Sequence, residues 1–355
     1  MSLDLLLQKN TYSYDLPKEL IAQYPLKDRS KSRLMVVDRA KKIIKHKHFE
    51  DVTEYLYPND VLVINTTKVF PARLFGKKET GGKVEVLLLT PVNKTDYTCL
   101  IKPASKIKIG SKILFEEGLS AELINFDSDG LRVVRFNCEK NLIKTIQKIG
   151  EMPLPPYITR ETNNEDKETY QTVYAKHNGS CAAPTAGLHF TQKMLEQIKN
   201  NKVIIAEVVL HVGLGTFRPV ESDDITKHKM HTEYCEVPEE TAKLINIAKN
   251  NKQNIVSVGT TTTRALESFS VDNQILNVTG ATFVNSGKKE TDIFIYPGQK
   301  FKVIDSQITN FHFPESTLLM MICAFAGYDL TMQAYSEAIK AKYRFYSYGD
   351  AMYIY

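Results

Sequence analysis

The segment CAAPTAGLHF (181–190) combines a cysteine with a histidine, which together could form a thiolate–imidazole pair for nucleophilic catalysis. Such a pair needs a lowered thiol pKa and a third group that orients the histidine. No neighbouring residue supplies either, so we interpret Cys181 as a small packed residue. Thr185 and Gly187 suit a tight loop whose backbone approaches a ligand closely. We expect a ligand loop in which His189 matters, although a lone histidine is more often structural.

A glycine-containing turn, LHVGLGTFRPVE (210–221), follows an apolar run that is typical of a buried strand. Its glycines resemble half of a dinucleotide-binding fingerprint, but the third glycine is missing and Pro219 interrupts any helix that would follow. We therefore expect Gly213, Gly215 and Thr216 to let a ligand come close to the backbone, without a Rossmann fold.

The segment HKMHTEY (228–234) places His231 and Glu233 three and five residues after His228. This spacing lacks the third and fourth ligands of a zinc site, so no metal is expected and a polar loop is the simplest interpretation.

The segment SVGTTTTRALES (257–268) predicts a strand, a glycine turn and a helix that begins at the threonines. Free amide groups and hydroxyls at a helix start can hold a carboxylate, and Arg264 could bind it with two hydrogen bonds. We therefore expect Thr260, Thr261 and Arg264 to bind a ligand. An N-cap followed by a surface arginine is the structural alternative.

Two C-terminal segments complete this set. TNFHFPEST (309–317) contributes Asn310 and His312, and YRFYSYGDAMYI (343–354) gathers aromatic rings around Asp350. Aromatic stripes are usually core, but here polar residues interrupt the pattern. Tyr346 and Tyr348 beside a carboxylate would suit a cationic ligand.

The elements that must position these loops fall into two kinds. Residues 66–156 read as short strands separated by turns, which predicts a small antiparallel β-barrel. Strands and helices alternate from about residue 170, which predicts an α/β layer, and residues 1–65 contribute further strands. A proline-rich stretch at 153–156 suits a boundary between domains. We expect an α/β domain (1–65 and 157–355) into which the barrel (66–156) is inserted.

Composition limits the function classes. The chain has 355 residues, too many for one core, and no apolar run approaches the roughly 20 residues of a membrane span. No signal-peptide pattern is visible, and the five cysteines are scattered without a CxxC, so we expect a cytoplasmic protein.

A net charge of +5 is compatible with a polyanionic partner. Four lysines in the barrel segment are candidate nucleic-acid contacts, although solvated surface lysines are the simpler interpretation: Lys102, Lys106, Lys108 and Lys112.

Eight segments, in this order, resemble the S-adenosylmethionine:tRNA ribosyltransferase-isomerases of queuosine biosynthesis. They are YDLPKELIAQYPLKDRSKSRL, AAPTAGLHFT, LHVGLGTFRPV, HKMHTEY, VGTTTTRALES, TDIFIYPG, NFHFPESTLL and YRFYSYGDAM. The resemblance covers nearly the whole chain. It implies an α/β domain with a β-barrel, and neither a metal nor a redox cofactor.

The resemblance also implies a reaction. S-adenosylmethionine donates its ribosyl group to 7-aminomethyl-7-deazaguanine at the wobble position of a tRNA with a GUN anticodon. Adenine and methionine leave, and epoxyqueuosine forms. Histidine suits the proton transfers this needs near neutral pH. The candidate proton-transfer residues are His189, His211, His231 and Glu233. The candidate donor-binding residues are Thr185, Gly187, Gly213, Gly215, Thr216, Thr260, Thr261, Arg264, Asn310, His312, Tyr346, Tyr348 and Asp350.

Without the resemblance, two other classes remain open. An S-adenosylmethionine-dependent RNA methyltransferase would need the glycine-rich fingerprint that is missing here, and a non-catalytic RNA-binding module would not need so many glycine and histidine loops. We expect a monomer.

Overall fold

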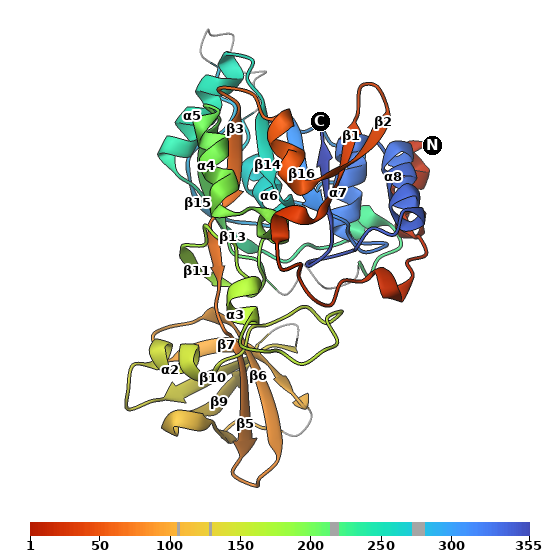
Figure 1. Ribbon diagram of the computed structural model, residues 1–355. Helices are drawn as coiled ribbons and strands as arrows, with labels where there is room; N and C mark the ends of the chain where they lie inside the picture. Colours follow the sequence, from red (N-terminus) through yellow and green to blue (C-terminus); the bar gives the residue numbers. More distant parts are fainter. Residues whose placement is uncertain (105–106, 128–129, 214–219, 272–280) are drawn as a thin grey trace.

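The structure, a computed structural model, describes residues 1–104, 107–127, 130–213, 220–271 and 281–355. It has a large mixed α/β part and a separate β-barrel below it (Figure 1). An α/β fold with an inserted antiparallel barrel, as the sequence predicts, is therefore confirmed.

The α/β part is built on a nine-stranded sheet. In spatial order its strands are β15 (Gly287–Thr291), β13 (Glu233–Val237), β12 (Ile204–Leu210), β3 (Val61–Asn65), β14 (Ile255–Val258), β16 (Ser306–Asn310), β17 (Ala351–Ile354), β1 (Arg33–Asp38) and β2 (Ile43–His48). The central strands β12, β3, β14 and β16 are parallel, and both edges of the sheet are antiparallel.

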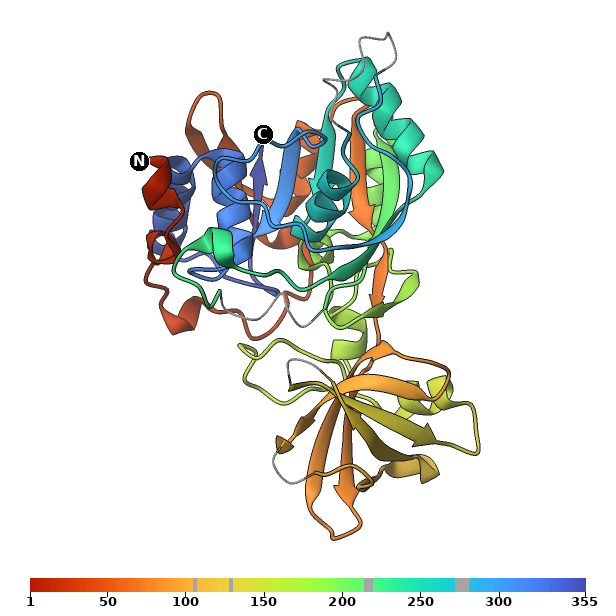
Figure 2. The ribbon, with the colours of Figure 1, turned by 180° about the vertical axis from the view of Figure 1, so that it is seen from behind.

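Alternating side chains along these strands fill two cores, because successive residues of a strand point to opposite faces. Val61 and Val63 pack with the helices α5 to α8, whereas Leu62 and Ile64 pack on the other face with α4 and Phe49. Figure 2 shows the helical layer on the first face. The helices are α1 (Leu3–Leu6), α3 (Asp166–Thr169), α4 (Gln192–Asn200), α5 (Glu239–Asn250), α6 (Thr260–Ser268), α7 (Thr317–Ala326) and α8 (Tyr328–Lys340).

Short 3-10 turns connect many of these elements. They are Lys9–Tyr12, Lys18–Leu20, Arg29–Lys31, Phe49–Tyr55, Glu116–Gly118, Thr185–His189 and Ile225–Lys227. The expected ligand loop at 181–190 thus contains one 3-10 turn and leads into α4. Thr191 is the N-cap of this helix and accepts a hydrogen bond from the amide of Met194.

The barrel closes in the order β10 (Arg132–Asn137), β7 (Asp96–Lys102), β6 (Lys83–Pro91), β5 (Arg73–Lys78), β8 (Lys112–Leu114) and β9 (Ser120–Phe126). Helix α2 (Leu142–Ile149) packs against its core through Ile146. The chain passes between the two parts through a parallel ribbon of β4 (Thr67–Val69) and β11 (His177–Ser180).

From the sequence alone, the run DIFIY (292–296) predicts a strand and Pro17 predicts the start of a helix. Both predictions are wrong. The segment 292–296 (DIFIY) forms no strand. Its aromatic side chains pack onto the core without pairing to a neighbouring strand, and the carbonyl of Ile293 accepts a hydrogen bond from Arg264 Nε instead. The helix expected after Pro17 is a single 3-10 turn, because the following residues pair with the backbone of Phe345.

In the part of the chain that the structure describes, no single helix has the length and apolarity of a membrane span. Helices α7 and α8 have that length and apolarity only when they are taken as one segment, and the chain bends by 116° between them.

Candidate functional site

A pocket lies at the carboxyl ends of the parallel strands β14 and β16, where ligands bind in many open α/β sheets. The loop 182–186 closes one side, and the start of α6 forms another. Several of the candidates lie together here. We call this the donor pocket because it gathers residues that the sequence offers as candidates for binding the donor; they include Thr185, Thr260, Thr261, Asn310, His312 and Tyr346.

Aromatic rings form one wall of the donor pocket. Tyr346 stacks on Phe313 with ring centroids 3.9 Å apart, and the ring of Tyr157 lies 4.8 Å from that of Tyr346. Tyr346 has a φ of 70°, a left-handed conformation that is strained for a tyrosine and concentrates at functional sites. A wall of ring faces is suited to a cation.

The start of α6 forms the opposite wall. Gly259 takes a φ of 90°, which glycine adopts without cost, and turns the chain from β14 into the helix. The hydroxyls of Thr262 and Thr263 bond back to Val258 and Gly259, and that of Thr261 accepts from Asn65. Thr260 and the first amides of α6 remain at the pocket, where the positive end of the helix dipole favours an anion.

His189 lies behind the donor pocket and reaches it through Asn310. Asn310 Nδ2 lies 3.2 Å from His189 Nε2, and Thr185 donates to Asn310 Oδ1 at 2.9 Å. His189 Nδ1 lies 2.6 Å from Ser32 Oγ, which itself donates to the carbonyl of Arg29. These directions are satisfied together when His189 is neutral and carries its proton on Nδ1.

Burial, together with the nearby charges of Arg29 and Arg344, lowers the pKa of His189 to about 3. Burial alone lowers the pKa of His312 to about 3. Both histidines are therefore neutral hydrogen-bonding groups at neutral pH, and neither is suited to store a proton there.

Arg264 and Glu233 form a buried ion pair, and Glu233 Oε1 accepts a hydrogen bond from the amide of Gly213 at 2.8 Å. The guanidinium also donates to the carbonyl of Ile293 at 3.2 Å. The guanidinium of Arg264 therefore positions Glu233, which in turn binds the amide of Gly213. Arg264 does not line the donor pocket.

His211 lies on a second pocket, which contains Gly213, His231 and Glu233 and shares Val212 with the donor pocket. Its Nδ1 is 2.7 Å from Thr67 Oγ1, and its ring stacks on Tyr234. Partial burial lowers its pKa, with His177 adding to the effect, so His211 is mostly neutral at neutral pH and remains partly accessible.

Besides Gly213 and Arg264, three further candidates lie outside the donor pocket. Gly187 packs against Tyr174, whose hydroxyl would be 2.0 Å from an added Cβ, so this glycine serves packing. Tyr348 donates to Asp166, and the Asp350 carboxylate accepts from the amides of Arg33 and Arg344. Burial raises the pKa of Asp350.

Gly215, Thr216 and Lys106 lie outside the described residues. Of the barrel lysines, Lys102 lines a pocket between the barrel strands and the segment 151–162 that contains the proline run. Lys108 and Lys112 are exposed. Cys181 is buried, which raises its pKa to about 12, as expected for a packed thiol. Within the described ranges, no three His, Cys, Asp or Glu side chains lie close enough together to hold a metal ion.

Sequence reasoning missed Tyr157 and Ser347, which line the donor pocket and are hydrogen-bonded to each other through their hydroxyls. The proline run before Tyr157 signals the domain boundary. An aromatic residue directly after it was the available sign that the boundary also builds the pocket.

Comparison with known proteins places this geometry in context. A family model described as "Queuosine biosynthesis protein" matches residues 9–354. The chain is 51% identical over 346 residues to an S-adenosylmethionine:tRNA ribosyltransferase-isomerase of Natranaerobius thermophilus, covering 97% of this chain and 98% of that protein. A protein of the same name from Staphylococcus aureus is 52% identical over 345 residues, with the same coverage. The crystal structure of S-adenosylmethionine tRNA ribosyltransferase from Thermotoga maritima is similar with a TM-score of 0.54 and 36% identity, over 97% of this chain and 100% of that one.

Proposed function

The chain belongs to the queuosine biosynthesis protein family and is an S-adenosylmethionine:tRNA ribosyltransferase-isomerase, and we propose that its donor pocket binds S-adenosylmethionine for transfer of the ribosyl group to tRNA. The observation that carries this proposal is the 51% identity over 97% of the chain, combined with a pocket at the carboxyl edge of the sheet. The methyltransferase and the passive RNA-binding module are not favoured.

The walls of the donor pocket suit two charged groups of this donor. The methionine carboxylate binds at the start of α6, near Thr260 and Thr261, where free amides and the helix dipole favour an anion. The sulfonium faces the rings of Tyr157, Phe313 and Tyr346, which attract a cation through their π faces. Asn310 and Thr185 hydrogen-bond the sugar, which is attached to the sulfonium on the side away from the methionine carboxylate. His312 also lines the pocket, and Asp350 supports the arrangement from outside it.

Proton transfer is assigned to the second pocket. The sulfonium acidifies the C5′ protons of the donor, so a base is needed there, and the departing adenine needs a proton. His211 is the better candidate, because its pKa is lowered by partial burial and it remains partly accessible, whereas His189 is fully enclosed. His231 lies in the same pocket, and Glu233 is held by Arg264. His189 then orients Asn310.

The acceptor in this proposal is 7-aminomethyl-7-deazaguanine at the wobble position of a tRNA with a GUN anticodon, and the product is epoxyqueuosine. In this proposal the enzyme is a cytoplasmic monomer. It uses neither a metal nor a redox cofactor. The mildly basic chain, with a net charge of +5, and the barrel lysines support an RNA partner.

One assay tests the function. The protein is incubated with S-adenosylmethionine and tRNA that carries the aminomethyl-deazaguanine, and released small molecules are identified by mass spectrometry. Free adenine and methionine, in equal amounts, are expected. Release of S-adenosylhomocysteine would show methyl transfer, and no release would leave a binding module. The matched control is the same tRNA with guanine at the wobble position, which lacks the acceptor amine.

A further inference from the structure

A small pocket beside the donor pocket is built around two arginines, Arg29 and Arg344. Ser32, His189 and Ser347 also line it, and we call it the arginine pocket. Ser347 lines both pockets, and His189 is hydrogen-bonded to Asn310 of the donor pocket. A group held in the arginine pocket therefore lies next to the donor pocket, where the proposed function places S-adenosylmethionine.

Neither guanidinium of the arginine pocket has an acidic partner. Arg29 Nη1 donates to the carbonyl of Gln171 at 3.1 Å, and Arg344 Nη2 donates to the carbonyl of Tyr24. Arg344 Nη1 is buried and has no hydrogen-bond acceptor among the residues described. Over the same residues, no carboxylate oxygen lies within 4.0 Å of either guanidinium.

The nearest carboxylates are already used. Asp350 accepts from the amides of Arg33 and Arg344, and Asp166 holds Arg160 through two hydrogen bonds of 2.7 and 2.6 Å. Two half-buried positive charges thus face one pocket. Burial lowers the pKa of both, and the charge of Asp350 offsets this effect only in part at Arg344, whose guanidinium forms no ion pair with that carboxylate. Desolvated guanidinium groups without acceptors are costly, and an oxyanion with several acceptor oxygens removes that cost.

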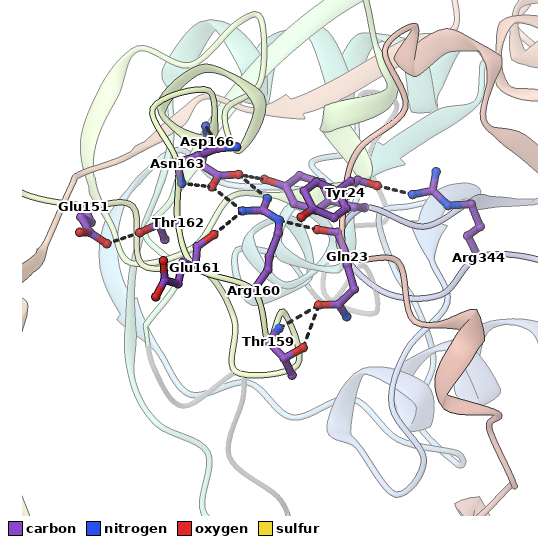
Figure 3. Close-up of polar contacts among 11 residues, drawn as sticks. Gln23, Tyr24, Glu151, Thr159, Arg160, Glu161, Thr162, Asn163, Asp166 and Arg344 are labelled. Atoms are coloured by element: carbon purple, nitrogen blue, oxygen red, sulfur yellow. Dashed lines mark hydrogen bonds and ion pairs between the residues drawn. The ribbon is translucent and has the colours of Figure 1, made fainter.

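The rim of the arginine pocket carries an exposed aromatic ring. Tyr24 is 58% exposed, and the guanidinium of Arg160 lies 4.5 Å from its ring centroid. Figure 3 shows Tyr24 between Arg160 and Arg344, with its carbonyl oxygen accepting a hydrogen bond from Arg344. Gln23 joins this rim to the segment after the proline run through Thr159. Exposed rings next to arginines are a common way to hold an unpaired base and its phosphate.

We propose that the arginine pocket binds a backbone phosphate of the RNA substrate next to the nucleotide that is modified, with a neighbouring base stacked on Tyr24. This inference rests on the proposed function, since it takes the RNA to be the second substrate. The methionine carboxylate is the other oxyanion in the reaction, and it is assigned to the start of α6. The phosphate is the better occupant, because the rim is open and aromatic.

The test compares Arg29→Gln and Arg344→Gln with Arg39→Gln. Arg39 is also half-buried with an unpartnered Nε, but it lies at the other end of β16, beside Asp305. Affinity for an unmodified anticodon stem-loop RNA is measured as a function of salt. We expect each pocket variant to bind the RNA about tenfold or more weakly and to reduce the slope of log K against log salt by about 1. Arg39→Gln should change neither quantity, and affinity for S-adenosylmethionine should stay the same in all three.

A second measurement needs no substitution in the protein. Single phosphates of the stem-loop are replaced by uncharged methylphosphonates, and binding to the wild-type chain is measured. A methylphosphonate at one position near the wobble nucleotide should weaken RNA binding as much as Arg344→Gln does. Combining this methylphosphonate with Arg344→Gln should weaken binding no more than either change alone. Equal losses at every phosphate, or pocket variants that bind RNA as Arg39→Gln does, would overturn the proposal. Loss of S-adenosylmethionine affinity with unchanged RNA affinity would overturn it in favour of the carboxylate. Adenine release by the wild-type chain reports the proposed function separately, since none of these binding measurements depends on turnover.

Discussion

The guanidinium of Arg264 and the carboxylate of Glu233 form an ion pair inside the fold, with side chains only 4% and 3% exposed. The same carboxylate accepts a hydrogen bond from the amide of Gly213. An ion pair this deep holds a turn in place only as long as both partners are present.

Replacing one partner of this pair should destabilise the protein strongly. In Arg264→Met, Glu233 is left as a buried carboxylate that has lost its cation, and we expect a loss of about 3–5 kcal/mol in the free energy of unfolding. The matched control is Lys176→Met, which breaks the exposed Lys176–Glu207 pair (55% and 38% exposed) and should cost less than about 1 kcal/mol. Urea denaturation at pH 7 measures both. Equal losses in the two variants would contradict the interpretation of Arg264 as a structural residue.

Asn310 should couple His189 to the donor pocket. Asn310→Ala removes the hydrogen bonds to His189 and Thr185, and we expect kcat/KM for adenine release to fall about tenfold or more. Because His189 acts through Asn310, adding His189→Ala to Asn310→Ala should lower kcat/KM little further. Losses that simply multiply in the double variant would show that His189 acts on the reaction by a route of its own.

Stability should decrease as the pH falls from about 6.5 to 5. His189 and His312 have folded-state pKa values near 3, so the unfolded chain binds protons in this window and the folded chain does not. Each histidine then reduces the free energy of unfolding by roughly 1.4 kcal/mol per pH unit once it is protonated in the unfolded chain. Urea denaturation between pH 7 and 5 measures this slope, and His312→Asn should reduce it by the contribution of one histidine, up to roughly 1.4 kcal/mol per pH unit. An unchanged slope in that variant would exclude His312 as a source.

Gly187 should tolerate no side chain. In Gly187→Ala the new Cβ meets the Tyr174 hydroxyl, 2.0 Å away in the native structure, and Tyr174 is buried and cannot move aside freely. We expect a loss of about 1–3 kcal/mol, measured by thermal or urea unfolding. Gly82→Ala is the matched control, since the atom it meets first is Cε of the flexible Lys78. If the two variants are equally stable, the packing role of Gly187 is wrong.

The barrel lysines should contribute to RNA affinity through charge alone. In the double variant Lys108→Glu, Lys112→Glu we expect weaker binding of the anticodon stem-loop and a salt slope smaller by about 2, as for two lost phosphate contacts. The control is Lys243→Glu on α5, in the helical layer of the sheet. A salt slope that does not change would place the RNA away from this side of the barrel.

Local sequence patterns predicted the elements well, because strand alternation and turn residues act over short distances. The six barrel strands and α6 follow directly from them. The segment 292–296 has the same alternation, but its aromatic side chains pack onto the core without strand pairing. A pattern of polar and apolar residues does not distinguish a paired strand from such a packed segment.

The donor pocket was only partly predictable for a related reason. Thr185, Thr260 and Asn310 come from three loops that the sequence marks by glycine, proline and hydroxyl residues, and the sheet brings them together. The partners of charged groups depend on contacts between distant segments. Arg264 looked like a ligand for a carboxylate, and the carboxylate it binds is Glu233 of its own chain.

The ribbon of β4 and β11 has a mechanical consequence for His211. The chain enters the barrel through one strand of this ribbon and returns through the other. Thr67, on β4, holds the imidazole at Nδ1, and Gly179, on β11, leaves so little room that an added Cβ would lie 2.7 Å from Nε2. A movement of the barrel that bends this ribbon would therefore shift the imidazole of His211. Binding of a large substrate to the barrel is thus coupled to the position of a side chain that can accept or donate a proton.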